Sequence, residues 1–310
     1  MSRGDDVECL DDPTMSYRID PQKPTGPEFR RIALEQLDRA RAELADPQLD
    51  RHESVHQVRK RCKKLRGLLR LCRGAIGKDY RGENARYRDA ARPLSGLRDA
   101  EALIEAYDRL MDRYDGPLER QDFAPVRRRL TLQKQHRAEV ETDLDARLEH
   151  FGREIEAGRE RIDKWCGRID GLDDCLSGFR KNYRRGRKAM KAALSRPSTE
   201  RFHEWRKRTK YLGQHLKLLE RLWKPVMRAH RKEAERLADL LGREHDFAVF
   251  QTHLEKEFAD YGNREVMTVL SGLIHERREE LRRKAALCGR RVFAEKPNRI
   301  AGRLKRLLEA

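Results

Sequence analysis

The sequence predicts an all-α protein, and three observations support this fold class. Nearly every segment between prolines has apolar residues at helical spacing, and almost none alternates apolar with polar residues. The seven prolines after residue 27 lie between these long segments, where helices are expected to end. A basic helical segment occurs twice, at 54–77 and 201–224, which indicates an internal duplication.

Composition narrows the class of protein further. The 310 residues carry a formal charge of +18, and 37% of them are hydrophobic, which suffices for a buried core. The chain has no uncharged apolar run of about 18 residues, so a membrane span is not expected. No signal peptide is apparent, and the six cysteines form no C-x-x-C pair. We therefore expect reduced thiols and a cytoplasmic protein.

The elements follow from this pattern in chain order. Residues 1–27 hold four of the eleven prolines and a net charge of −3, which predicts a flexible acidic segment. Unit 1 is then expected at about 28–150, a connecting helix at about 151–170 and unit 2 at about 171–308. Pro93 should break the third helix, and Gly152 and Gly158 weaken the helical pattern near 150–168. The predicted helices are 28–45, 51–76, 80–114, 123–150, 152–168, 174–194, 199–222, 225–261, 264–290 and 297–308.

The repeat aligns without gaps at an offset of 147 residues. Both copies read H-x-x-R-K-R-x-K-x-L, beginning at His56 and at His203. Asp99 and Asp246 each follow 43 residues after the histidine of their copy, and Arg81 matches Arg228. The alignment predicts two units of about four helices each, related by a pseudo-two-fold axis.

Each repeated helix has two different faces. One face is apolar and is expected to lie in the core of a bundle. It comprises Val55, Val58, Cys62, Leu65, Leu69, Cys72 and Ile76, matched by Phe202, Trp205, Thr209, Leu212, Leu216, Leu219 and Trp223. The adjacent face is cationic and comprises His56, Arg59, Lys60, Lys63, Arg66 and Arg70, matched by His203, Arg206, Lys207, Lys210 and Lys217.

The cationic face favours a polyanion as ligand. Like charges at i,i+3 and i,i+4 destabilise a helix by a few tenths of a kcal/mol per pair, and a bound polyanion would neutralise them. The alternative interpretation is a solvated charged face. Because the face is duplicated and lacks acidic residues, we favour the ligand site, in a groove or channel at the junction of the units.

Other charged residues extend this hypothesis. The helix before the second motif presents Arg180, Arg184 and Arg187, whereas the corresponding helix of unit 1 is less basic, so we expect an asymmetric site. Asp99 and Asp246 are interpreted either as carboxylates that orient a motif cation or as helix caps and bundle salt bridges.

Two observations bear on whether the protein is an enzyme, namely the positions of its histidines and the absence of known catalytic and nucleotide-binding motifs. His56 and His203 could donate hydrogen bonds to phosphate, pack at the edge of the apolar face, or accept a phosphoryl group. His52 and His56 have helical metal-ligand spacing, but no third ligand is apparent. There is no phosphate-binding loop and no dinucleotide fingerprint. We therefore expect no metal, no cofactor and no enzymatic activity.

Taken together, these motifs resemble the CHAD family, the conserved histidine α-helical domain. The resemblance rests on the two H-x-x-R-K-R-x-K-x-L helices, on LSGLRDAE (94–101) and LLGREHDFAV (240–249), and on FRKNYRRGRKA before the second helix. It implies paired four-helix bundles around a basic channel. CHAD proteins bind inorganic polyphosphate, are associated with polyphosphate granules, and are often fused to a triphosphatase domain, whose activity is not transferred here. We expect a stand-alone member.

The resemblance also implies the ligands and the partner. Polyphosphate would be bound by His56, Arg59, Lys60 and Lys63 with His203, Arg206, Lys207 and Lys210. The family's Arg-Asp pair, Arg98-Asp99 in unit 1, is His245-Asp246 in unit 2, a departure that leaves the basic partner's role open. Nucleic-acid binding by the same surface and a phosphohistidine or polyphosphate-processing enzyme are the alternatives.

Overall fold

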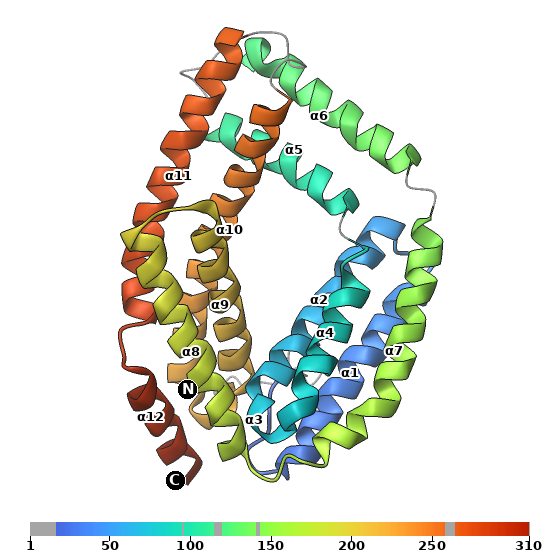
Figure 1. The fold of residues 1–310 in the computed structure, drawn as a ribbon, viewed down its shortest axis with the longest axis vertical. Helices are drawn as coiled ribbons and strands as arrows, with labels where there is room; N and C mark the ends of the chain where they lie inside the picture. The colour runs from blue at the N-terminus through green and yellow to red at the C-terminus, as the bar shows by residue number, and fades with distance from the viewer. Residues whose placement is uncertain (1–16, 95, 115–119, 141–142, 258–263, 310) are drawn as a thin grey trace, which may run out of the picture.

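The computed structural model describes residues 17–94, 96–114, 120–140, 143–257 and 264–309, and these residues form helices and no strand (Figure 1). The all-helical fold class is therefore confirmed. The helices are α1 (Thr25–Ala45), α2 (Arg51–Leu71), α3 (Arg73–Ile76), η1 (Gly77–Asp79), α4 (Tyr80–Ala91), α5 (Gly96–Arg113), α6 (Arg120–Val140), α7 (Leu144–Cys166), α8 (Leu172–Ser195), α9 (Thr199–Leu218), η2 (Glu220–Leu222), α10 (Lys224–Lys256), α11 (Arg264–Val292) and α12 (Pro297–Glu309).

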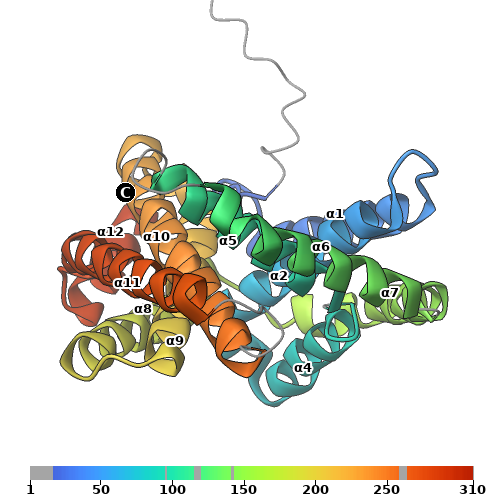
Figure 2. The same cartoon turned by 90° about the horizontal axis from the view of Figure 1, so that it is seen from above.

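The two halves of the chain lie side by side. Figure 2 shows α1, α2, α4 and α7 on one side and α8 to α12 on the other. Helices α5 and α6 cross over the end of the molecule, from the side of α7 to the side of α10 and α11 (Figure 1). The two basic helices are α2 and α9, and α5 contacts α2 and α10.

Both basic helices begin at a capped residue. The Asp50 carboxylate accepts a hydrogen bond from the backbone N–H of Glu53 at 2.8 Å, and the Ser198 hydroxyl accepts one from Arg201 at 3.3 Å. The caps fix the start of each helix within two turns of its histidine. They thereby set the rotation of each cationic face about the helix axis.

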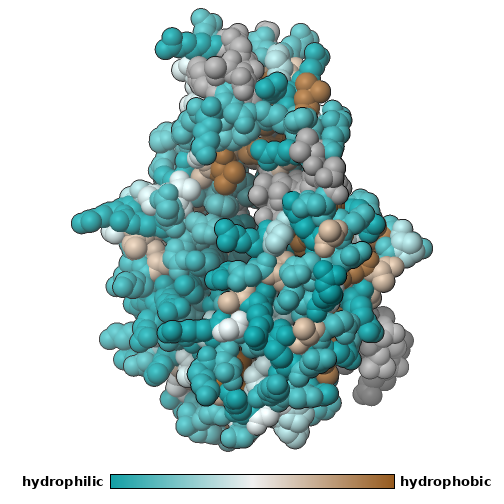
Figure 3. All heavy atoms as spheres, turned by 45° about the vertical axis from the view of Figure 1, so that its right-hand side comes forward, coloured by the Kyte–Doolittle hydropathy of each residue, from teal (hydrophilic) through white to brown (hydrophobic). Residues whose placement is uncertain are grey.

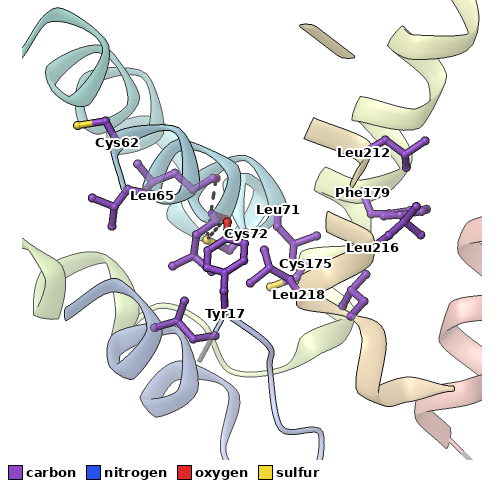
Figure 4. Packing of buried hydrophobic residues seen from close by; sticks show 14 of the residues in the cluster. Tyr17, Cys62, Leu65, Leu71, Cys72, Cys175, Phe179, Leu212, Leu216 and Leu218 are labelled. Carbon is purple, nitrogen blue, oxygen red and sulfur yellow. Dashed lines mark hydrogen bonds between the residues drawn. The ribbon is translucent and has the colours of Figure 1, made fainter. Parts of the chain in front are cut away.

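The predicted apolar faces are buried, with one exception. All seven positions on α2 and α3 and the first six on α9 lie in the core. Trp223 is 46% exposed, because α9 ends at Leu218 and the chain beyond it no longer follows the helical phase. Figure 4 shows Leu71, at the end of α2, near Cys175 of α8 and Leu218 at the end of α9. The same cluster extends to Leu65 on α2 in one direction and to Phe179, Leu212 and Leu216 in the other.

The cores do not divide between the two halves, as separate bundles would. One buried cluster joins α1, α2, α4, α7, α8, α9, α12, the first half of α10 and the end of α11. The other is formed by α5 and α6 with the second half of α10 and with α11, and includes Leu110, Phe123 and Phe250. The arrangement therefore differs from two self-contained four-helix units.

Several expected boundaries differ from the structure. The expected flexible segment 1–27 is too long, because Tyr17 and Ile19 are buried. The Tyr17 hydroxyl donates to the Lys64 carbonyl at 2.6 Å. Residues 1–16 lie outside the described part.

The expected helix 123–150 is divided, because α6 ends at Val140 and α7 begins at Leu144. Helix α7 then runs unbroken to Cys166 through both glycines, and Gly158 lies against the Tyr87 ring of α4, where a Cβ would have no room. The break at Pro93 is confirmed.

Two buried contacts join α2 to the second half of the chain. The His215 ring of α9 donates from Nε2 to the Gly67 carbonyl of α2 at 3.2 Å, and burial lowers its pKa to about 3, so the ring is neutral. Gly178 of α8 lies directly on the carbonyl oxygens of Arg70 and Leu71, and a Cβ at this position would overlap both. No larger residue fits this crossing without separating the helices.

We predict that Gly178→Ala destabilises the protein, because backbone atoms cannot move as freely as a side chain. The overlap is expected to cost about 2 kcal/mol or more in the free energy of unfolding. The control is Gly272→Ala in α11, where a Cβ meets nothing within 4 Å. That change should stabilise the helix by up to about 1 kcal/mol. Thermal denaturation measures both, and equal midpoints for the two variants would contradict the close crossing.

Candidate anion-binding site

A pocket of about 770 Å³ lies between α2, α5, α6, α9 and α10, and we call it the central pocket. It brings together residues of both sequence repeats, which are 147 positions apart in the chain. Its lining includes His56, Arg59 and Lys63 of α2, Arg206 and Lys210 of α9, and His245 and Asp246 of α10. Hydrophilic residues cover most of the molecular face in Figure 3.

The α2 wall presents cations at one-turn intervals. Arg59 donates from Nη1 to the Ala91 carbonyl at 2.8 Å, at the end of α4, where the helix dipole favours a cation. Lys63 and His56 are exposed at the pocket surface. Lys60 is exposed too but does not line the pocket, and its Nζ lies 3.5 Å from Oε1 of Gln57. The structure thus brings together three of the four α2 residues that were predicted as ligands.

The α9 wall holds two cations whose charge is costly in the free protein. Burial lowers the pKa of Arg206, and its Nε donates no hydrogen bond within the described residues. Lys210 lines the pocket, but surrounding protein limits the hydration of its ammonium. This burial, together with the nearby charges of Arg206 and Lys63, lowers its pKa to about 8. Lys207 pairs with Glu204 instead and lies outside the lining.

His245 of α10 lines the central pocket, whereas His203 of α9, a predicted ligand, lies beside it outside the lining. The rings of His203 and His245 lie 4.7 Å apart between centroids. Burial and the Arg206 charge lower the pKa of both rings, that of His245 to about 4. Both are therefore neutral at pH 7, and an anion that approached them would favour the charged form.

Among the carboxylates that line the pocket, Asp246 was indicated by the repeat and the others were not. Asp246 pairs with Arg109 of α5 at 3.2 Å rather than with a motif cation, and its charge also favours the charged forms of Arg206 and Lys210. The Asp99 side chain lies outside the described residues. Further acidic residues line the pocket where α5 and the start of α2 close it, namely Asp50, Glu53, Glu101 and Glu105. Lys134 of α6 pairs with Glu101.

The remaining cations on α2 lie beyond the central pocket. Arg66 lines a side hollow of about 210 Å³ with Arg88 and Arg92, and this side hollow shares Arg59 and Lys63 with the central pocket. Arg70 lies one turn further along. Its guanidinium stacks 4.2 Å from the Tyr211 ring centroid, and it donates to the Tyr80 hydroxyl at 2.8 Å.

Several predicted ligands have other roles or lie elsewhere. Arg187 donates to the Ala294 and Glu295 carbonyls after α11, and Arg228 lies 3.5 Å from the buried Glu220 carboxylate. Lys217 lies near Arg18 and Arg231, and burial lowers its pKa. Arg81, Arg180 and Arg184 are exposed and line none of the hollows described here. The residues of α8 beside α2 are instead Lys181 and Arg185, which the sequence analysis missed.

Comparison with known proteins identifies the class of this arrangement. The CHAD domain family model matches residues 31–255, which include both basic helices and the central pocket. The chain therefore belongs to the CHAD family, whose domains are known to bind polyphosphate-related ligands. No curated protein and no solved structure was found to be similar to the chain. Within the described residues, no helix is long and apolar enough to cross a membrane.

We predict that Lys210 titrates near pH 8 in the free protein, because protein surrounds it and Arg206 and Lys63 repel its charge. The pKa follows from lysine side-chain NMR signals recorded between about pH 6 and pH 11. Lys210→Arg removes one signal and thereby assigns it. Added polyphosphate should raise this pKa, since an anion favours the charged amine. A Lys210 signal that titrates near the ordinary lysine value without ligand would contradict the described environment.

Proposed function

We propose that this protein binds inorganic polyphosphate without catalysing a reaction on it, through the central pocket between α2 and α9. The observation that carries the proposal is the convergence of Lys63 and Lys210, the matching lysines of the two repeats, on one pocket. The ungapped repeat supports a duplication that placed the two cationic faces about a pseudo-two-fold axis. A polyanion between them would meet positive charge from both sides.

The physical state of the pocket supports an anionic ligand. Lys210 and Arg206 both have lowered pKa values, so their charges destabilise the free protein. A phosphate chain would offset that cost by direct charge-assisted hydrogen bonds, for which Arg and Lys are suited. Carboxylates at the α5 side, such as Glu105, would repel the same ligand and confine it to the α2 and α9 walls.

The absence of stacking rings favours phosphate chains over nucleic acid. Apart from imidazoles, the described residues that line the central pocket include no aromatic side chain. Single-stranded nucleic acids gain about 1–3 kcal/mol per base by stacking on aromatic rings. Polyphosphate has no bases, and its closely spaced charges need only cations. Binding would retain the protein at polyphosphate granules, which fluorescence microscopy of a tagged protein can test.

We predict that Lys63→Ala/Lys210→Ala weakens binding of medium-chain polyphosphate by at least about 100-fold, or about 2.7 kcal/mol. The reason is that both charges act on the same ligand at close range. Isothermal titration calorimetry at about 150 mM salt measures the affinity of the wild type and the variant. Arg153→Ala/Lys164→Ala on the outer helix α7 removes the same net charge far from the pocket and serves as control.

The same titration separates the proposal from its alternatives. Duplex DNA should bind much more weakly than polyphosphate at equal charge concentration, and it should compete poorly. Equal affinity for both polymers, unchanged by the double variant, would contradict a dedicated site. Release of inorganic phosphate from polyphosphate in the presence of Mg²⁺, or an acid-labile label on the protein, would contradict the non-catalytic role.

A further inference from the structure

A second group of cations lies where α8 crosses α2 and α3. Around this crossing gather Arg70 and Arg73 from the first half of the chain, with Lys181, Arg185 and Arg208 from the second, and we call these five residues the crossing cluster. They surround a shallow hollow whose described lining also includes Gly178 and Asn182 but no carboxylate. The close crossing at Gly178 holds these positive groups together.

The charges of the crossing cluster are largely uncompensated. Arg208 pairs with Glu204 at 2.6 Å, and Arg73 lies over the Tyr80 ring at 4.5 Å. Lys181 and Arg185 form no ion pair within the described residues. Arg73 is the largest cause of a lowered pKa at Lys181, and burial, followed by Arg208 and Arg73, lowers the pKa of Arg185. The free protein therefore maintains a repulsion that a bound anion would relieve.

General basicity of the chain does not by itself explain the cluster, because several positions that match it at the repeat offset are acidic or paired with a carboxylate. The offset of 147 residues relates Arg73 to Glu220 and Arg185 to Asp38. Glu220 is buried and accepts from Arg18 at 3.1 Å and from Arg231 at 2.7 Å. Asp38 pairs with Arg159 of α7. The residue that matches Arg208 is Arg61, and it pairs with Glu43. The positive charge gathered at the crossing cluster is therefore not repeated at these matching positions.

A continuous row of cations joins the central pocket to the cluster. Arg59 and Lys63 belong to both the central pocket and the side hollow, Arg66 belongs to the side hollow, and Arg70 belongs to the cluster. Burial and then the nearby charge of Arg70 lower the pKa of Arg66, which shows that the two guanidinium groups lie close together. From Arg59 to Arg70 the row covers about 17 Å along the helix axis.

We propose that a polyphosphate chain bound in the central pocket continues along α2 and leaves the protein on one side only, over the crossing cluster. This inference rests on the proposed function and adds a second binding subsite to it. It follows that long chains contact both subsites, whereas tripolyphosphate is held by the central pocket alone. The protein would thus select polyphosphate by chain length.

The test compares two probes, tripolyphosphate and long-chain polyphosphate, by calorimetric titration. Lys181→Ala/Arg185→Ala should weaken long-chain binding by about tenfold. It should also make the slope of log K against log salt concentration less steep by about two, one for each lost phosphate contact. Its affinity for tripolyphosphate should equal that of the wild type. The matched control, Arg153→Ala/Lys164→Ala, removes two exposed charges from α7 and should change neither affinity.

The outcomes distinguish the two proposals. Unchanged long-chain affinity in Lys181→Ala/Arg185→Ala would overturn the second subsite and leave the central pocket intact. An equal loss for both probes would also overturn it, because the cluster would then not be a separate extension. If the wild type binds neither probe, or if Lys63→Ala/Lys210→Ala binds both as tightly as the wild type, the proposed function fails, and this inference fails with it.

Discussion

The close packing of α2 against α8 and α9 is the constraint on which the rest of the structure depends. Gly178 lies on the carbonyl oxygens of Arg70 and Leu71, and the neutral His215 ring is hydrogen-bonded to the Gly67 carbonyl. These contacts fix two strongly cationic helices beside each other. Packing of the apolar faces offsets the repulsion between the cationic faces, so the fold itself concentrates positive charge at the central pocket.

That concentration explains the unusual protonation of the site. Burial and the charges of Arg206 and Lys63 outweigh the nearby carboxylates of Asp246 and Asp239, so the pKa of Lys210 is lowered to about 8. Burial and neighbouring cations lower the pKa of His245 to about 4, so its ring is neutral at pH 7. Asp246 is itself paired with Arg109. A polyanion that binds in this pocket relieves the cost of its buried and mutually repelling charges, and binding is therefore favourable. This is the basis of the proposed function.

Much of the fold and part of the site could be predicted from the sequence, because both are local patterns. Helical periodicity identified the buried face from Val55 to Ile76, and the repeat identified Lys63 and Lys210. The features that were not predicted depend on contacts between residues that are far apart in the sequence. The docking of Tyr17 against α2 and the passage of α5 over the pocket, with Glu101 and Arg109, leave no periodic signal. On α8, the sequence predicted the exposed Arg180 and Arg184 as ligands. The residues that lie beside α2 are Lys181 and Arg185, each one position further along the helix.

The central claim is that one anion lies between the two repeats, and the most direct measurement is a crystal structure of the protein grown with polyphosphate. The account predicts phosphate groups in the central pocket within hydrogen-bonding distance of both Lys63 Nζ and Lys210 Nζ, at about 2.7–3.2 Å. A chain bound only on the outer faces of the helices, with neither lysine in contact, would contradict it.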